Sequence, residues 1–173
     1  INTKDIKVGN LESIKNDLPL LLPEQQDDVF KAEIRMFVNN KPGMLFTNGT
    51  GTGKTFTGLG IVKRFVEQGK KNILSVSPCT GINDGWIDSG KKFGLNIVPL
   101  KNKKDNGDNN ISITTLNNFT SNKTLVNRSW DLVVIDECHK LISNQNNKET
   151  GAIKNLRAIT LNERGFNTRF DYL

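Results

Sequence analysis

The chain has 173 residues, of which 35% are hydrophobic and 24% are charged, and its formal net charge is +6. This size and composition fit one compact globular domain, and no apolar run approaches the roughly 18–20 residues that cross a bilayer. The chain starts without an initiator Met or an apolar signal core, so we expect a fragment of a cytoplasmic protein that is not secreted. Two cysteines without metal-ligand spacing, Cys79 and Cys138, fit a reducing compartment. The basic balance favours polyanionic partners.

In chain order, residues 1–20 read as an extended or short-helix lead-in, and apolar residues at three- and four-residue steps predict a helix over 24–39. The triplet 44–46 predicts a short buried strand, and the glycine-rich segment 48–55 leads into a helix that Gly69 closes. Further strands are predicted at 72–76, 95–99, 111–114, 131–135 and from 170, helices at 81–93 and 151–164, and polar loops at 101–110 and 144–148. Strands that alternate with helices predict an α/β fold with a mostly parallel sheet.

The glycine-rich segment has the pattern of a phosphate-binding loop. Its residues are Asn48, Gly49, Thr50, Gly51, Thr52, Gly53, Lys54 and Thr55. Glycines let backbone N–H groups turn toward phosphate oxygens, and the N-terminus of the next helix adds partial positive charge. Lys54 can reach the β- and γ-phosphates, and Thr55 can offer its hydroxyl to Mg²⁺. Asn48 departs from the Gly of the general pattern, but Asn tolerates unusual backbone angles. The segment therefore predicts ATP and Mg²⁺ as cofactors.

An acidic box follows the apolar strand predicted at 131–135. Asp136 and Glu137 would lie at the carboxyl edge of the sheet, where open α/β folds bind ligands. Asp136 is expected to hold Mg²⁺ directly or through water, and Glu137 to orient or deprotonate the attacking water. His139, the one histidine of the chain, is placed to bridge the ATP site and a neighbouring domain. Taken alone, Asp136 and Glu137 could form a solvated strand end, but the phosphate loop upstream favours the catalytic interpretation.

Together these segments resemble the first RecA-like domain of superfamily 2 helicases and translocases. The box Asp136-Glu137-Cys138-His139 is similar to the Asp-Glu-Ala-His type, and the lead-in from Ser129 to Ile135 is similar to that of Swi/Snf-type translocases and of phage and restriction-system helicases. The resemblance implies a RecA-like P-loop NTPase fold, a three-layer sandwich with a mostly parallel central sheet. It covers about residues 18–173, so residues 21–173 are expected to be the ATP-binding domain.

Three smaller matches occur in the family's order. The segment Leu21–Gln25 resembles the upstream Leu-x-Pro-x-Gln element, which implies that Gln25 reads the adenine edge. The stretch through Ser77 and Pro78, with Trp86 downstream, resembles motif Ia. Thr114 and Thr115 resemble motif Ib, although Leu116 replaces its aromatic residue. The resemblance thus implies nucleic-acid contacts at these two pairs of residues.

The resemblance also implies partners and an activity for the complete protein. Motif III would follow soon after Leu173, and the second RecA-like domain with its arginine finger lies outside the chain, so we expect ATP binding with very slow hydrolysis. The expected activity of the complete protein is ATP-dependent movement along nucleic acid, with double-stranded DNA favoured over RNA, and no membrane association.

One alternative is a nucleic-acid-sensing switch that does not unwind. A small-molecule P-loop kinase is disfavoured, because Glu137 suits water activation and no lid segment is recognisable.

Overall fold

The structure is a computed structural model that describes residues 6–41, 43–47, 53–141 and 151–161. The chain divides into two compact units, residues 1–69 together with 168–173, and residues 70–167. The predicted loop at 144–148, the predicted strand from 170 and most of the phosphate loop, Asn48–Thr52, lie outside the described residues. The boundary expected between residues 20 and 21 stays a prediction.

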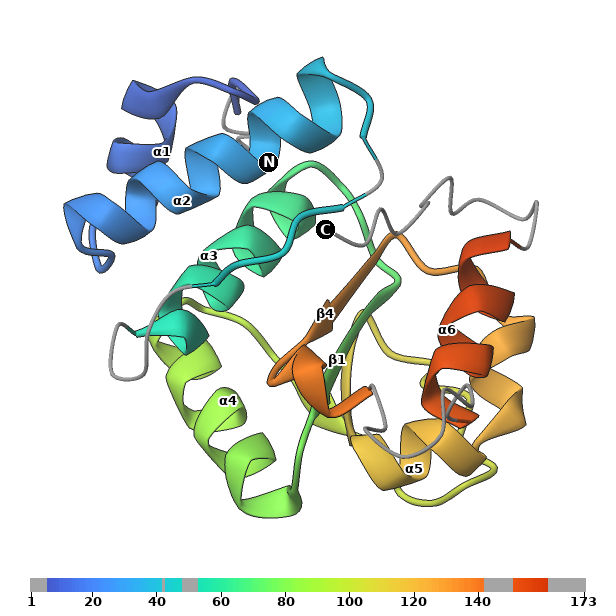
Figure 1. Cartoon of the computed structure of the whole chain (residues 1–173). Coiled ribbons are helices and arrows are strands. Elements are labelled where there is room, and N and C mark those ends of the chain that lie inside the picture. Colours follow the sequence, from blue (N-terminus) through green and yellow to red (C-terminus); the bar gives the residue numbers. More distant parts are fainter. Residues whose placement is uncertain (1–5, 42, 48–52, 142–150, 162–173) are drawn as a thin grey trace. The chain divides into compact units, whose positions relative to one another are not determined.

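The first unit is helical in its described part (Figure 1). Its elements are α1 (Leu11–Asp17), α2 (Pro23–Glu33), the π-helical turn η1 (Ile34–Val38) and α3 (Lys54–Glu67). The Asn10 side chain accepts a hydrogen bond from the Ser13 backbone and caps α1, while Pro23 opens α2 at a position that needs no N–H donor. At the far end of α3, Gly69 takes a φ of +82° and ends the helix.

A close approach between α2 and α3 depends on Gly60. A Cβ at this position would lie 3.0 Å from Leu21 Cδ2 and 3.1 Å from Leu18 Cδ1, two side chains of the turn between α1 and α2. It would also lie 3.4 Å from Val29 Cγ2 on α2. The absence of a side chain on Gly60 therefore lets the apolar faces of the helices meet without strain.

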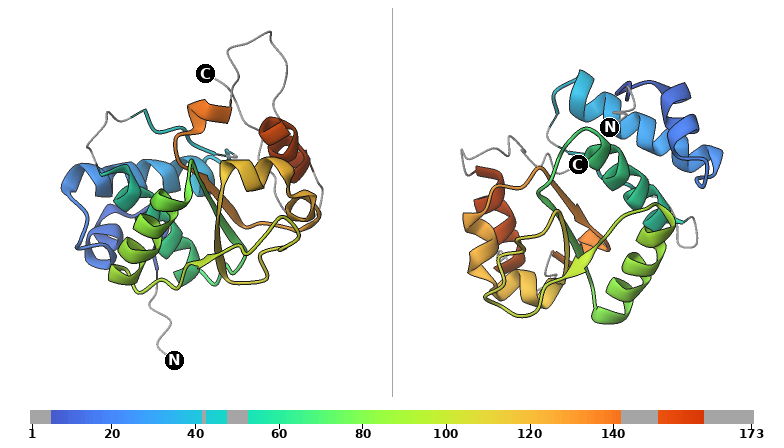
Figure 2. Two further views of the ribbon diagram at one scale, coloured as in Figure 1. Left: turned by 90° about the horizontal axis from the view of Figure 1, so that it is seen from below. Right: turned by 180° about the vertical axis from the view of Figure 1, so that it is seen from behind.

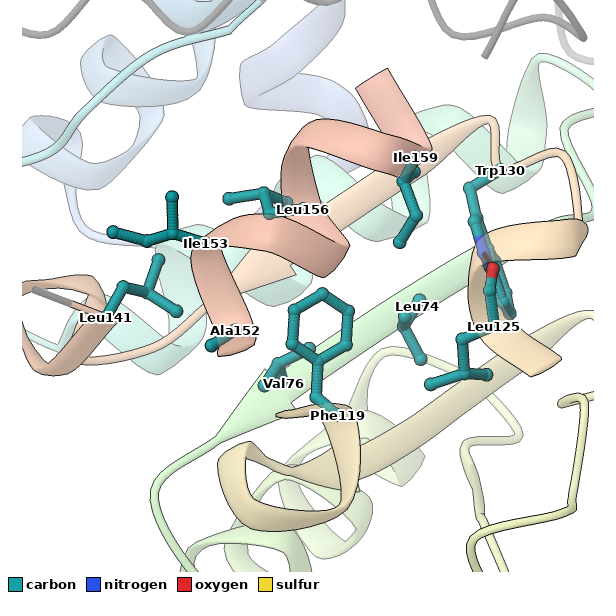
Figure 3. Packing of buried hydrophobic residues seen from close by; sticks show 10 residues of the cluster. All are labelled: Leu74, Val76, Phe119, Leu125, Trp130, Leu141, Ala152, Ile153, Leu156 and Ile159. Atoms are coloured by element: carbon teal, nitrogen blue, oxygen red, sulfur yellow. Dashed lines mark hydrogen bonds between the residues drawn. The ribbon is translucent and has the colours of Figure 1, made fainter. Parts of the chain in front are cut away.

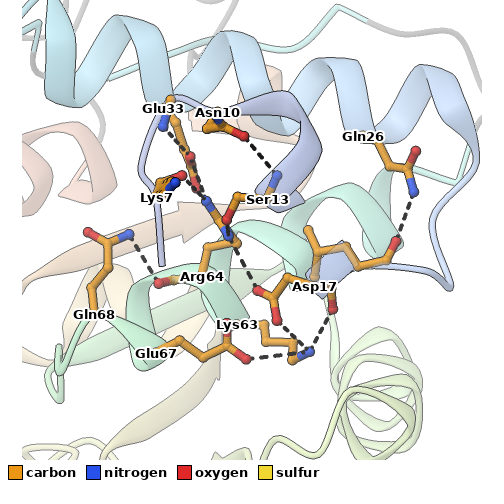
Figure 4. Close-up of polar contacts among 12 residues, drawn as sticks. Lys7, Asn10, Ser13, Asp17, Gln26, Glu33, Lys63, Arg64, Glu67 and Gln68 are labelled. Atoms are coloured by element: carbon orange, nitrogen blue, oxygen red, sulfur yellow. Dashed lines mark hydrogen bonds and ion pairs between the residues drawn. The ribbon is translucent and has the colours of Figure 1, made fainter. Parts of the chain in front are cut away.

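Buried charges also join the three helices (Figure 4). Arg64 of α3 is fully buried, and its Nε and Nη2 donate to the two carboxylate oxygens of Glu33 at 2.6 and 3.1 Å. The same guanidinium donates to the Lys7 carbonyl at 3.0 Å and to Ser13 Oγ at 3.1 Å. Burial disfavours the cation, but the hydrogen bond to Glu33 and its charge more than offset this and hold the pKa of Arg64 above its usual value. Arg64 is therefore a cation that bonds to three separate segments of the unit.

The second unit contains a four-stranded sheet among its described residues. The strands are β1 (Ile73–Ser77), β2 (Val98–Pro99), β3 (Ile111–Thr115) and β4 (Leu132–Ile135), in the order β2-β3-β1-β4. All neighbouring pairs are parallel, and β1 pairs with β3 from Ile73–Ile111 to Ser77–Thr115. The parallel sheet confirms the predicted α/β fold class.

Helices cover both faces of this sheet. Leu74 and Val76 of β1 point into a cluster formed by α5 (Leu116–Ser121), α6 (Gly151–Leu161) and two 3₁₀ turns, η2 (Lys123–Asn127) and η3 (Cys138–Leu141) (Figure 3). The alternating residue Ser77 points the other way, toward Asn83 of α4 (Thr80–Lys92). Figure 1 shows α4 and α6 on opposite sides of the sheet, and both views of Figure 2 show α5 beside α6. The unit therefore has the expected three layers.

The predicted elements agree with the structure except at a few segments. The helix predicted at 24–39 continues from α2 into η1, and the strand predicted at 95–99 is limited to β2. The buried strand predicted at 44–46 is wrong, because Met44–Phe46 is irregular and the Leu45 side chain is 56% exposed. An apolar triplet does not define a strand, which depends on pairing with a neighbour. The helix α5 and the turns η2 and η3 were not predicted.

Candidate functional site

The described end of the phosphate loop is Gly53, which precedes the first residue of α3. Gly53 has φ +71° and ψ +37°, a left-handed conformation that glycine adopts at little cost. Its carbonyl accepts from the Phe56 backbone at 3.0 Å and from the Thr57 backbone at 3.3 Å. Lys54 and Thr55 are the first two residues of the helix and are half-buried. A helix N-terminus with a lysine and a hydroxyl in its first turn suits a phosphate ligand.

Gln25, predicted to read adenine, lies against this turn. Its side-chain Oε1 accepts from the Leu22 backbone at 2.8 Å and its Nε2 donates to the Gly53 carbonyl at 3.2 Å. A Cβ on Gly53 would overlap Gln25 Nε2, so this contact also requires a glycine at the end of the loop. Gln25 is buried in the first turn of α2 and links that helix to the start of α3. Its role toward adenine stays a prediction.

Asp136 follows β4 at the carboxyl edge of the sheet. Its backbone N–H donates to the Val76 carbonyl at 2.9 Å and extends the pairing of β4 with β1 by one residue. Its side-chain Oδ2 accepts from the indole Nε1 of Trp86 at 3.2 Å. The backbone and the carboxylate of Asp136 are thus both held, by β1 and by α4.

Glu137 is in an uncommon backbone conformation. Its φ is +54°, which only a few per cent of residues other than glycine adopt. Such a conformation costs on the order of 1–3 kcal/mol and is found most often at functional sites. Its carboxylate lies 3.3 Å from His139 Nδ1, and the His139 side chain is 70% exposed, so this contact is open to water and weak. The positive φ turns the chain away from the strand directly after Asp136.

The residues predicted to contact nucleic acid lie at the same sheet edge. Ser77 pairs with Thr115 in the parallel register, and Thr114 pairs with Val76, the residue whose carbonyl binds the Asp136 backbone. Ser77 and Thr114 are buried, with 1% and 3% exposure, while Pro78 and Thr115 are half-buried. The Asn118 side chain donates to Thr114 Oγ1 at 2.6 Å, and the Asn118 backbone donates to Thr115 Oγ1 at 3.3 Å.

The structure therefore brings the acidic box and the candidate nucleic-acid residues to one edge of the second unit. Gln25, Gly53, Lys54 and Thr55 belong to the first unit. The oxygen donors predicted for Mg²⁺, the Thr55 hydroxyl and the Asp136 carboxylate, are of the hard type that this ion prefers. No cluster of three or more His, Cys, Asp or Glu residues was found in the part of the chain that the structure describes.

Two residues that contact site residues, Trp86 and Asn83, could not be identified as such contacts from the sequence. Trp86 was noted only as part of a motif, and its bond to Asp136 joins positions 50 residues apart. Asn83, one helical turn before Trp86, accepts a hydrogen bond from Ser77. Their spacing of three residues places both side chains on one face of a helix. This pattern does not identify the strand end that they contact.

Comparison with known proteins finds a matching family and similar proteins. Residues 19–164 match the family described as type III restriction enzyme, res subunit. The chain is also 26% identical over 178 residues to a protein of Acanthamoeba polyphaga mimivirus named "Putative helicase L115". That alignment covers 95% of this chain but 14% of the viral protein, so the chain spans about one seventh of that relative's length. Among the described residues, none of the helices has the length and apolar character needed to cross a membrane.

Proposed function

The chain belongs to the family of the type III restriction enzyme res subunit, a helicase-type ATP-binding domain, and from this premise we propose that it is half of a nucleic-acid motor. In this proposal, ATP hydrolysis by the complete protein drives movement along nucleic acid, with double-stranded DNA as the favoured track. The similarity to a viral protein named as a helicase supports the same reading. A second RecA-like domain is the proposed partner.

Nucleotide binding is assigned to the loop and to the start of α3. The backbone N–H groups of residues 48–53 would surround the phosphates, with the Lys54 ammonium as their cation. The left-handed Gly53 and the helix that starts directly after it support this assignment. Gln25 is proposed to read the adenine edge, and its contact with the Gly53 carbonyl would couple base recognition to the phosphate loop.

Hydrolysis is assigned to the end of β4. Thr55 and Asp136 would hold Mg²⁺, which when bound neutralises charge on the phosphates. Glu137 would orient the attacking water and accept its proton. His139, whose Nδ1 is 3.3 Å from the Glu137 carboxylate, would link the ATP site to a neighbouring domain. The observation that carries the proposal is Asp136 at the carboxyl edge of a parallel sheet, with one hydrogen bond to its carboxylate from Trp86 and one from its backbone N–H to Val76.

Nucleic-acid contacts are proposed for the carboxyl ends of β1 and β3 and the residues that follow them. Pro78 and Thr115 are half-buried at this edge, whereas the Ser77 and Thr114 side chains are bonded inside the unit. Contacts at Ser77 and Thr114 would therefore come from the backbone or through rearrangement. Such contacts are directed mainly to phosphates, so binding should be sensitive to salt and tolerant of sequence.

The test is ATP turnover by the intact protein, with and without double-stranded DNA. We expect DNA to stimulate turnover and Glu137→Gln to abolish it while nucleotide binding is retained, because an amide cannot accept a proton from water. Glu12→Gln, the same chemical change at an exposed position of α1, is the matched control and should leave turnover unchanged. If DNA does not change the rate of ATP turnover, the alternative of a small-molecule kinase is favoured. If DNA stimulates turnover but the protein shows neither strand displacement nor translocation, the alternative of a nucleic-acid-sensing switch is favoured. Full hydrolysis in Glu137→Gln would show that another residue positions the water.

A further inference from the structure

The indole of Trp86 is bonded to the carboxylate proposed to hold Mg²⁺. Trp86 lies in α4 with 3% of its surface exposed, and its Nε1 donates to Asp136 Oδ2 at 3.2 Å. An indole nitrogen can only donate a hydrogen bond, and a bond to an ionised acceptor is stronger than one between neutral groups. This contact therefore fixes one of the two carboxylate oxygens of Asp136.

The helix that carries Trp86 is itself fixed at the same strand ends. Asn83 is buried one helical turn before Trp86 and accepts a hydrogen bond from Ser77 at the end of β1. The Asp136 backbone is held by the Val76 carbonyl at 2.9 Å, also on β1. One face of α4 is thus joined to the ends of two neighbouring strands, and the indole is aimed from a rigid support.

The other tryptophan of the chain shows what a purely structural indole does here. Trp130 is 1% exposed, and its Nε1 donates to the Leu125 backbone carbonyl at 2.9 Å in the apolar cluster between the sheet and α6 (Figure 3). A buried indole needs an acceptor, and a carbonyl suffices. Trp86 instead uses a carboxylate, whose Oδ1 has no hydrogen bond among the described residues.

We propose that Trp86 is a positioning residue for Asp136, which holds Oδ2 through the indole and thereby directs Oδ1 toward the Mg²⁺ that accompanies a bound nucleoside triphosphate. This inference rests on the proposed function, since it concerns the same metal site. Groups that orient a metal ligand from behind commonly change metal affinity about 10- to 100-fold when they are removed. The expected effect is therefore on Mg²⁺ dependence rather than on the fold.

The contact is tested first by ¹⁵N–¹H spectroscopy of the 173-residue chain. The two indole groups give two cross-peaks, which Trp86→Phe and Trp130→Phe assign. Asp136→Asn should shift the Trp86 peak by more than its linewidth and leave the Trp130 peak in place. An unchanged Trp86 peak would overturn the proposal without any reference to nucleotide.

The role is tested by binding of a fluorescent ATP analogue, followed by anisotropy, in EDTA and over a series of MgCl₂ concentrations. Trp86→Phe keeps an aromatic ring but removes the donor, and should raise the MgCl₂ concentration at half-maximal enhancement about tenfold, with affinity in EDTA unchanged. Trp130→Phe loses an equivalent indole bond away from the acidic box, so it is the matched control and should keep the wild-type Mg²⁺ dependence.

The outcomes separate this inference from the proposed function. If the wild-type chain binds the analogue and Trp86→Phe shows the wild-type Mg²⁺ dependence, the positioning role is wrong and the proposed function stands. A rise in both tryptophan variants would assign the effect to packing and would also overturn the role. If the wild-type chain binds no analogue with or without Mg²⁺, the proposed function fails and the role fails with it.

Discussion

Replacing Arg64 with Met should destabilise the first unit strongly. The substitution keeps an unbranched side chain in α3 but removes a fully buried guanidinium that donates two hydrogen bonds to Glu33. Glu33 is 2% exposed, and among the described residues it would keep only the bond from the Gly9 backbone at 2.8 Å. The loss therefore leaves a buried carboxylate without its cation.

The expected cost follows from that buried charge. Removing one partner of a buried ion pair typically destabilises a protein by about 3–5 kcal/mol. This is a large share of the roughly 5–15 kcal/mol that holds a domain folded. Urea unfolding followed by far-ultraviolet circular dichroism should show a much lower midpoint for Arg64→Met. The double variant Arg64→Met with Glu33→Leu should recover part of the loss, since the carboxylate is then also gone.

Lys31→Met is the control for this experiment. It also removes a cation from a helix of the same unit, but the Lys31 side chain is 58% exposed and pairs with Asp27 in water. Its urea midpoint should stay near that of the wild-type chain. Equal midpoints for Arg64→Met and Lys31→Met would refute the reasoning, because they would mean that burial of Glu33 carries no charge penalty.

Two further predictions concern the same unit. Burial and the neighbouring carboxylate of Asp17 raise the pKa of Glu67 to about 7, so the folded state holds this proton more tightly than the unfolded chain, whose Glu pKa is 4.5. The stabilisation is complete below about pH 4.5 and is lost as the pH rises through 7, and Glu67→Gln should remove this part of the pH dependence of the urea midpoint. Gly60→Ala should lower the thermal midpoint, because overpacking costs about 1–3 kcal/mol and outweighs a gain in helix propensity of about 1 kcal/mol. Gly85→Ala in α4, where a Cβ meets nothing within 4 Å, should raise it, and a fall of equal size in both variants would contradict this account.

Much of the fold could be predicted because its helices and strands follow local patterns in the sequence. The apolar run predicted at 131–135 contains β4, although β4 lies at an edge of the described sheet and only Leu132 of its four residues is buried. The helix after Lys54 was correctly placed by its apolar period and Gly69. The helix α5 was missed although Thr115 caps it through the Asn118 backbone. This segment is polar and short, so its periodicity is weak even though its capping residue was visible.

The contacts around the candidate site could not be predicted in the same way. The bond between Trp86 and Asp136 and the one between Gln25 and Gly53 join residues that are 50 and 28 positions apart. Such contacts depend on which helix packs against which strand end, and periodicity gives only the face of each element. The left-handed conformation of Glu137 could not be predicted either, because glutamate is not a residue type that favours a positive φ.

The most direct test of the central claim is the affinity of the chain for ATP when Lys54 is replaced by Ala. Lys54 would make a charge-assisted contact with phosphate, and its loss should cost roughly 1.5–3 kcal/mol, which corresponds to an affinity about 10- to 150-fold weaker. Lys70→Ala removes the same charge at an exposed position outside α3 and should bind ATP as the wild-type chain does. Equal ATP affinity in Lys54→Ala and the wild-type chain would contradict the account, because the phosphate site would then lie elsewhere.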